Sequence, residues 1–348
     1  MTRWFALVAF AIATAPAFLF WCWLGRPQHV ADAGVERVAC LSYSPFRSGQ
    51  SPFDPTFVVP RAQIEEDLRI LAARTGCVRS YAVNQGLEIV PEVAEAVGLH
   101  VVLGAWLGRV PEHNAREIAV AIELANSHPR TVRAIVVGNE ALLRGEIAPE
   151  ALAALLHDAQ KRTDVPITYA DVWEFWVRNG PVLVDAVDFV TVHILPYWED
   201  EPVAIDHAMA HVEAVIGLVE QAFPGKPIMI GEVGWPSAGR MRDGAVPSRV
   251  NQARFIREFV AFAEKRRLSY NLIEAFDQPW KRALEGTVGG HWGFFDAERR
   301  PKFELSGPVS NYPDWLFGFI AASLLATLPV LSAATKGKLS RVRWLLLA

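Results

Sequence analysis

The feature that most constrains the fold is an alternation of short apolar runs with longer amphipathic segments between residues 28 and 313. The apolar runs are Val38–Tyr43, Val78–Tyr81, His100–Ala105, Ala134–Val137, Pro166–Tyr169, Phe189–His193, Pro227–Ile230 and Tyr270–Ala275. Between them, apolar residues recur at helical spacing, as at Ala208, Val212, Val215 and Val219. Eight strand–helix repeats of this kind predict a (β/α)8 TIM barrel.

A doubly wound open sheet shows the same alternation, so the pattern alone leaves both folds open. One argument for the open sheet is missing, because no G-x-G-x-x-G follows the first apolar run. The alternation continues without a compositional break, and we therefore expect a single domain over residues 28–312.

Two apolar runs without charge flank this region. Trp4–Leu24 has 21 residues and Trp315–Ala334 has 20. Each is long enough to cross about 30 Å of hydrocarbon as a helix. The first run is also compatible with a cleavable signal peptide, although its apolar part is longer than usual. We predict an N-terminal membrane anchor over residues 1–27 and a C-terminal transmembrane helix with a basic cytoplasmic flank over residues 313–348.

Charges beside the second run predict its orientation. Only Asp314 lies just before it, whereas four basic residues follow it: Lys336, Lys338, Arg341 and Arg343. The positive-inside rule then places the C-terminus in the cytoplasm and the barrel outside, in the periplasm or extracellular space, on the inner (plasma) membrane. Cys40 and Cys77 would lie where disulfides persist. A disulfide and two separate buried thiols are both open at this point.

Composition argues against other classes of function. The net charge of −4, with no basic stripe, gives no indication of a nucleic-acid partner. The nine histidines and three cysteines show no zinc-like spacing. The glycine-rich stretch Glu285–Gly293 does not lie between a strand and a helix, as a phosphate loop does. We expect no metal and no cofactor.

Polar and aromatic side chains follow the apolar runs, at the strand ends that form the active site of a TIM barrel. Aromatic rings stack on the apolar faces of sugars, and carboxylates and amides bind their hydroxyls. The expected binding residues are Tyr43, Arg79, Tyr81, Asn139, Tyr169, Asp171, His193, Tyr197, Trp235, Glu274 and Lys281. Packing is the alternative for the tyrosines, and a structural ion pair is the alternative for Arg79.

Two glutamates stand out at these strand ends. Glu140 follows the fourth apolar run, and Glu232 ends the seventh. In a barrel their carboxylates would face each other across the mouth. Glycoside hydrolysis uses one carboxylic acid to protonate the leaving oxygen, and a second carboxylate to attack the anomeric carbon or to activate water. A separation of about 5–5.5 Å gives retention, and about 6.5–9.5 Å gives inversion.

The residues around these glutamates resemble a known family. Val137–Glu140 (VGNE) and Gly231–Ser237 (GEVGWPS) are similar to the two signature sites of glycoside hydrolase family 17. The family comprises β-1,3-glucanases of plants and fungi, with bacterial membrane-anchored relatives. The resemblance covers most of residues 38–305. Leu195–Trp198 and Asp277–Lys281 resemble the bacterial branch, in which β-glucan hydrolysis and glucanosyl transfer both occur.

The resemblance implies a retaining barrel enzyme in which Glu232 is the nucleophile and Glu140 is the acid/base. Arg79 is then a candidate to stabilise the ionised nucleophile. Asn139 is expected to hydrogen-bond the sugar 2-hydroxyl.

Two further positions follow from the resemblance. Glu274 and Lys281 resemble the family's strand-eight pair near the nucleophile. Leu195 departs from the pattern, because plant enzymes tend to carry an aromatic residue there, and His193 lies two residues earlier. The residue that orients the nucleophile from the sixth strand is therefore left open.

The expected function is cleavage or transglycosylation of β-1,3-glucan in the cell envelope by double displacement. The expected partners are a β-glucan oligosaccharide or polysaccharide, the membrane and a glucan synthase. The alternative is a non-catalytic glucan-binding module of a membrane glucan synthase system. Such a module would keep the aromatic residues but would need neither Glu140 nor Glu232.

Overall fold

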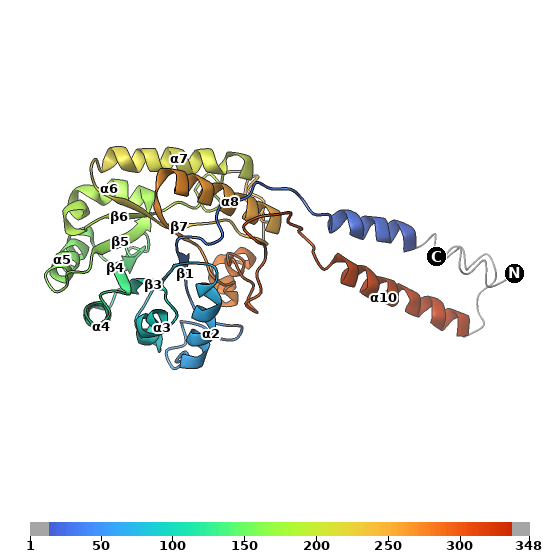
Figure 1. Cartoon of the computed structure of the whole chain (residues 1–348), viewed down its shortest axis with the longest axis horizontal. Coiled ribbons are helices and arrows are strands. Elements are labelled where there is room, and N and C mark those ends of the chain that lie inside the picture. The colour runs from blue at the N-terminus through green and yellow to red at the C-terminus, as the bar shows by residue number, and fades with distance from the viewer. Residues whose placement is uncertain (1–13, 336–348) are drawn as a thin grey trace. The chain divides into compact units, whose positions relative to one another are not determined.

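A computed structural model of the chain describes residues 14–335, with the side chains of residues 14–326. Residues 31–307 form one compact unit, and the described flanking residues, 14–30 and 308–335, belong to a second. The described flanks contain a helix over residues 14–24 and helix α10 (Trp315–Thr335) (Figure 1).

The membrane-spanning helices predicted from the sequence are not found in the structure. In the part of the chain that is described, no helix is both long and apolar enough to cross a membrane. The predicted anchor over residues 1–27 and helix over residues 313–348 also include residues 1–13 and 336–348, which lie outside the described residues.

The larger unit is built on a closed parallel barrel whose strands follow one another in chain order. The strands are β1 (Leu41–Ser42), β2 (Cys77–Arg79), β3 (His100–Ala105), β4 (Val132–Asn139), β5 (Ile167–Val172), β6 (Val190–His193), β7 (Ile228–Val233) and β8 (Ser269–Leu272). Closure is made by the parallel pairing of Leu41 on β1 with Leu272 on β8. The TIM barrel is thus confirmed, and the open-sheet alternative is wrong.

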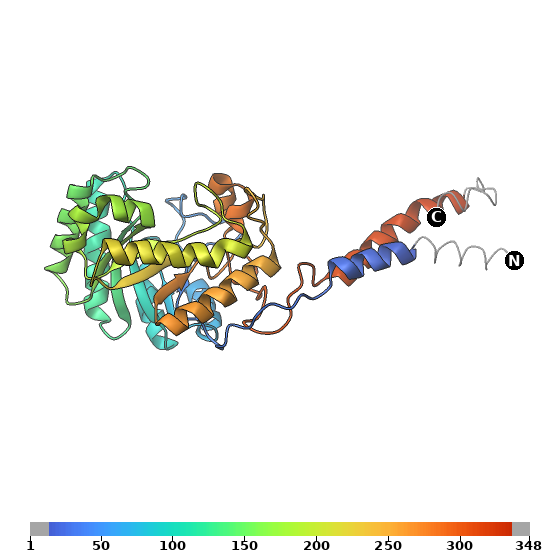
Figure 2. The ribbon, with the colours of Figure 1, turned by 90° about the horizontal axis from the view of Figure 1, so that it is seen from above.

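Helices surround the barrel, as Figure 1 shows for α4 to α7. The α-helices are α2 (Arg61–Ala72), α3 (Val90–Ala96), α4 (Pro111–Ser127), α5 (Pro149–Gln160), α6 (Trp173–Leu183), α7 (Ile205–Ala222), α8 (Arg249–Arg266) and α9 (Arg282–Glu285). The short 3-10 helices are η1 (Leu87–Ile89), η2 (Val184–Ala186), η3 (Pro279–Lys281) and η4 (Thr287–Gly290). Helices α7 and α8 run side by side (Figure 2).

Local sequence explains these helices. Proline occupies the first turn of α4 and α5, where its missing N–H has no intrahelical partner in any case. The Oγ of Ser248 caps α8 by accepting a hydrogen bond from the backbone N–H of Asn251 at 3.0 Å. Each long helix buries one apolar face, as α5 does with Leu152 and Leu156. Burial of these faces holds the barrel strands in register beneath the site.

A disulfide joins Cys40 to Cys77, linking the residue before β1 to the first residue of β2. This finding settles the alternative that the sequence left open. Cys40 also belongs to a buried apolar cluster inside the barrel, which includes Val102, Val136 and Met229. The bridge therefore lies at the start of β2, whereas the predicted site residues gather at the strand ends.

Candidate active site

Glu140 is placed by a tight turn at the end of β4. Gly138 has φ 89° and Glu140 has φ 52°, a left-handed conformation that is unusual for a residue with a side chain. The backbone N–H of Glu140 donates to the carbonyl oxygen of Ala170 on β5 at 2.8 Å. Such strain costs about 1–3 kcal/mol and persists where neighbouring contacts impose it. The turn directs the Glu140 side chain to the barrel mouth.

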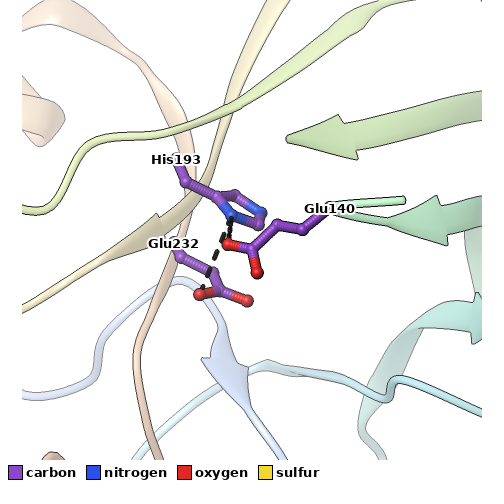
Figure 3. A group of neighbouring side chains, drawn as sticks. All are labelled: Glu140, His193 and Glu232. Atoms are coloured by element: carbon purple, nitrogen blue, oxygen red, sulfur yellow. Dashed lines mark hydrogen bonds and ion pairs between the residues drawn. The ribbon is translucent and has the colours of Figure 1, made fainter. Parts of the chain in front are cut away.

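Glu140, His193 and Glu232 converge from β4, β6 and β7 (Figure 3). The Nδ1 atom of His193 lies 2.9 Å from Oε1 of Glu140 and 3.8 Å from Oε2 of Glu232. One ligand atom from each of the three side chains lies within 4.8 Å of the others. The two predicted catalytic carboxylates therefore lie next to each other, and Nδ1 of His193 is directed at both (Figure 3).

Glu232 is 5 % exposed and is held by two residues of the second strand and its loop. Its Oε1 accepts a hydrogen bond from the hydroxyl of Tyr81 at 2.7 Å and from Nη1 of Arg79 at 3.3 Å. Arg79 also donates to the carbonyl oxygen of Gly231 at 2.9 Å and to Oδ1 of Asn139 at 2.5 Å. This guanidinium thus stabilises a negative charge on Glu232 and fixes its backbone.

Gly231 leaves room for the His193 ring. A Cβ at residue 231 would lie 2.6 Å from Cγ2 of Thr191 and 3.0 Å from Cδ2 of His193. The Nε2 atom of His193 is buried and has no hydrogen-bond partner among the described residues. A proton on Nε2 would lack an acceptor, so the neutral ring carries its proton on Nδ1, facing Glu140.

The same contact sets the protonation of Glu140. Burial raises the pKa of Glu140, but the hydrogen bond and charge of His193, followed by the charges of Arg144 and Arg79, outweigh burial and lower this pKa overall. The free site therefore favours the carboxylate form of Glu140. The carboxylate form suits a general base. To act as a general acid, Glu140 must carry a proton although its pKa is lowered.

The three converging residues have donor types that bind metal ions, but their surroundings do not suit one. A metal on Nδ1 of His193 would force the ring proton onto Nε2, which has no acceptor in the part of the chain that the structure describes. The guanidinium of Arg79, 3.3 Å from Glu232, would also repel a cation. The arrangement fits acid–base chemistry better than metal binding.

Tyr169 and Asp171 lie under the loop that follows Glu140. Both are fully buried, and the Tyr169 hydroxyl donates to Oδ2 of Asp171. The backbone N–H of Leu142 donates to the Tyr169 hydroxyl at 2.9 Å, and that of Leu143 donates to Asp171 at 3.3 Å. These residues, predicted to bind substrate, thus hold the turn that carries Glu140.

Glu274 and Lys281 form a buried pair after β8. The Nζ of Lys281 donates to Oε2 of Glu274 at 3.0 Å, while Oε1 of Glu274 has no hydrogen-bond partner within the described structure. Burial raises the pKa of Glu274 to about 7, against the opposing charge of Lys281. Burial lowers the pKa of Lys281, but the charges of Glu274, Glu285 and Glu232 outweigh it and raise this pKa. The pair therefore interacts electrostatically with Glu232.

Three other predicted binding residues are buried in packing contacts. Tyr43 donates to Asp67 at 3.3 Å, and Tyr197 donates to the carbonyl oxygen of Arg240 at 2.5 Å. Trp235 is fully buried and packs on Tyr197. Tyr43 thus lies in a packing position, which was the alternative given for it. Tyr197 and Trp235 support the loops after β6 and β7.

The sequence prediction did not include Arg144 and Glu285. Arg144 donates to the carbonyl oxygens of Asn139 at 2.7 Å and Leu107 at 3.1 Å, so it joins the ends of β3 and β4. Glu285 is an exposed residue of α9, and its pKa is raised by partial desolvation of its carboxylate and by the charges of Glu232 and Glu140, against Lys281. No catalytic motif contains either residue. A charged residue in a loop is usually solvated, so its type and position alone do not indicate a place in the site.

Comparisons with known proteins agree with this geometry. A family model described as BtgE/BtgC glycoside hydrolase domain matches residues 40–293. A glucan 1,3-beta-glucosidase of Arthroderma benhamiae is 27% identical over 272 residues, covering 73% of this chain and 87% of that protein. The enzyme of the same name from Saccharomyces cerevisiae is 25% identical over 267 residues, covering 69% and 84%.

Solved structures show the same barrel. The glycoside hydrolase family 17 beta-1,3-glucanosyltransferase from Rhizomucor miehei is 26% identical, with a TM-score of 0.66, and the match covers 76% of this chain and 95% of that one. An active-site mutant of the Rhizomucor miehei enzyme, in complex with laminaritriose, is 25% identical with the same TM-score of 0.66. The predicted bacterial membrane-anchored branch is not confirmed by these matches. Because the family model covers more than half of the chain, this protein belongs to the BtgE/BtgC glycoside hydrolase domain family, and its resemblance to glycoside hydrolase family 17 is confirmed.

Proposed function

We propose that this protein cleaves β-1,3-linked glucan with retention at the anomeric carbon, through a glycosyl intermediate on Glu232. One observation carries the proposal: carboxylate oxygens of Glu140 and Glu232 lie within 4.8 Å of each other at the barrel mouth. Retaining enzymes hold their carboxyl groups about 5–5.5 Å apart, whereas inverting enzymes leave about 6.5–9.5 Å for a water. The short separation favours direct attack by Glu232.

In the first step, a carboxylate oxygen of Glu232 forms a bond to the anomeric carbon as the glycosidic C–O bond breaks. Protonated Glu140 gives its proton to the leaving oxygen, which departs as a sugar hydroxyl. Tyr81 and Arg79 hold Oε1 of Glu232 at 2.7 Å and 3.3 Å, which leaves Oε2 as the attacking atom. Holding the Glu232 carboxylate in place lowers the entropic part of the barrier to its attack on the anomeric carbon.

In the second step, Glu140 is ionised and acts as a base. It removes a proton from a water molecule or from the hydroxyl of a second glucan chain, and the resulting oxygen attacks the anomeric carbon and releases Glu232. Water gives hydrolysis and an acceptor glucan gives transfer. The His193 contact that lowers the pKa of Glu140 favours its base form in this step.

The substrate class comes from the relatives. Glucan 1,3-beta-glucosidases cover most of this chain at 25–27% identity, and a related glucanosyltransferase structure contains laminaritriose. The non-catalytic glucan-binding module is the weaker candidate. Binding alone does not require two adjacent carboxylates, nor the hydrogen bonds from Tyr81 and Arg79 that hold Glu232.

The test is incubation of the protein with a reducing-end-labelled β-1,3-gluco-oligosaccharide, with products followed by mass and the first anomer formed identified by NMR. We expect the β-anomer first, and products longer than the substrate if transfer operates. Glu232→Gln should lose turnover and keep oligosaccharide binding, while Glu213→Gln, an exposed change on α7, should match the wild type. Unchanged turnover in Glu232→Gln would reject the mechanism, and the α-anomer would indicate inversion.

We also propose that the barrel works outside the cytoplasm, in the cell envelope. The Cys40–Cys77 disulfide supports this location, because such bonds persist in oxidising compartments. Protease added to intact cells should degrade the barrel once an outer barrier is removed. Protection that persists until the cells are lysed would place the barrel inside.

A further inference from the structure

A cavity of about 350 Å³ opens beside the ends of β2 and β3. Its walls come from the loop after β2, at Val83 and Asn84, from the loop after β3, which begins at Trp106, and from the first turns of helix α4. These loops follow the carboxyl ends of their strands, so the cavity is on the same barrel face as Glu140 and Glu232. Its volume is in the range of small-ligand sites, about 300–1,000 Å³.

The cavity walls are fixed before any ligand binds. The buried carboxylate of Glu117 accepts hydrogen bonds from the backbone N–H groups of Val83 and Trp106, both at 3.1 Å. The side chain of Asn114 donates to the carbonyl oxygen of Gly108 and accepts from its N–H, both at 2.8 Å. Helix α4 therefore clamps both loops, and a ligand would not have to order them.

Trp106 supplies an aromatic surface in this cavity. The residue is 39 % exposed, although tryptophan is highly buried on average. The guanidinium of Arg144 lies 4.4 Å from the ring centroid, and Arg144 is held by the carbonyl oxygens of Asn139 and Leu107. Arg144 covers one face of the ring and does not line the cavity. One face of the indole ring therefore contacts Arg144, and the rest of the ring lines the cavity.

A second cavity, of about 550 Å³, lies by the loops after β6 and β7. Its tryptophan, Trp198, already has two ring partners: Trp292 stacks on it at 6.3 Å, and the guanidinium of Arg242 lies 5.2 Å from its centroid. Of the tryptophans lining these two cavities, Trp106 therefore offers the open surface.

We propose that the cavity beside Trp106 is a subsite for a glucosyl residue of the β-glucan chain, with Trp106 as its stacking platform. The proposal rests on the function proposed above and extends it to a residue of the chain beyond the bond that is cleaved. Apolar C–H faces of a glucosyl ring fit the indole, and Asn84, Arg109 and His113 offer polar groups for its hydroxyls. Arg144 connects this platform to Asn139, the neighbour of Glu140.

The test measures binding by calorimetry in the Glu232→Gln background, with β-1,3-gluco-oligosaccharides of two to seven units. We expect affinity to rise with chain length until the subsite is filled. Adding Trp106→Ala should remove that rise and weaken the longest ligand about tenfold, and Trp106→Phe should restore part of it. Adding Met241→Ala, an exposed change in the second cavity, is the matched control and should keep the rise.

Each alternative outcome has a distinct meaning. An unchanged rise in affinity with Trp106→Ala would overturn the subsite and leave the proposed function standing. An equal loss at every length would mean that Trp106 acts only through packing, which also overturns it. A loss confined to Met241→Ala would move the subsite to the second cavity. If the Glu232→Gln protein bound none of the oligosaccharides, the proposed substrate and the subsite would both be rejected.

Discussion

Glu140 and His193 are joined by a hydrogen bond of 2.9 Å between Oε1 and Nδ1, and the same Nδ1 lies 3.8 Å from Oε2 of Glu232. The sixth strand therefore contributes a donor that is closer to the predicted acid/base than to the predicted nucleophile. The residues that fix the nucleophile come instead from the second strand and its loop, namely Arg79 and Tyr81. The sequence left open which residue of the sixth strand orients the nucleophile, and in this structure the hydrogen bonds to Glu232 come from Arg79 and Tyr81 instead.

The pH dependence of activity should report the His193 contact. Its hydrogen bond and charge are the main favourable contributions that lower the pKa of Glu140 against burial. Since the acid step needs protonated Glu140, a lower pKa makes kcat/KM fall at a lower pH on the basic side. His193→Ala should raise this pKa and move the basic limb of the kcat/KM profile to higher pH.

His193→Gln is the matched variant, because its amide N–H can still donate. It should shift the basic limb less than His193→Ala does. Thermal unfolding of both variants checks that the barrel is intact. A basic limb that stays in place in His193→Ala would show that His193 does not act through Glu140.

Replacement of Glu140 by Gln should reveal whether it acts as the acid. We expect kcat/KM to fall about 10²–10⁴-fold for a β-1,3-gluco-oligosaccharide, because its leaving hydroxyl needs a proton. The loss should be much smaller for an aryl glycoside whose phenolate leaves without one. Rates with both substrates, for the wild type and the variant, make the comparison. Equal losses on the two substrates would argue against an acid role.

The buried pair after β8 predicts a pH dependence of stability. The pKa of Glu274 is raised from 4.5 to about 7 in the folded protein, mainly by burial. A carboxyl with a raised folded pKa contributes stability that is complete below about pH 4.5 and is lost as the pH rises through about 7. Glu274→Gln should therefore flatten the fall in unfolding free energy between these two pH values.

Urea unfolding at several pH values measures this slope, with Glu213→Gln as the control for a glutamate that is exposed. The slope is compared rather than the absolute stability, because Glu274→Gln also removes the partner of Lys281. If the wild type and Glu274→Gln lost stability in parallel, the titration would belong to other groups.

The disulfide should contribute to stability but not to the chemistry. Cys40 and Cys77 are 37 residues apart, and a cross-link of this kind stabilises a protein by about 2–4 kcal/mol. Cys40→Ala with Cys77→Ala should lower the unfolding free energy by about this amount. Its kcat should match that of the wild type below the unfolding transition, because the bond is near the start of β2. A reductant should destabilise the wild type and leave the double variant unchanged.

The sequence by itself determined the eight strands and the two glutamates at their ends, and its resemblance to a known family predicted the barrel that the strand pattern alone left open. Eight apolar runs set the strands, because buried strands need apolar residues. The motifs around Glu140 and Glu232 marked the strand ends, because Gly138 permits the turn before Glu140 and Gly231 leaves room beside Glu232 for the His193 ring. Arg79 was also foreseen beside the nucleophile.

Only the tertiary structure decided how the remaining side chains are shared between packing and chemistry. Tyr169 and Asp171 lie on β5 and Tyr81 lies just after β2, yet the first two support the loop after Glu140 while Tyr81 contacts Glu232. Likewise, His193 pairs with Glu140, and Arg144 lies on Trp106, through contacts between distant strands. These choices depend on which side chains meet when the barrel closes, and a linear pattern of residue types does not contain that information.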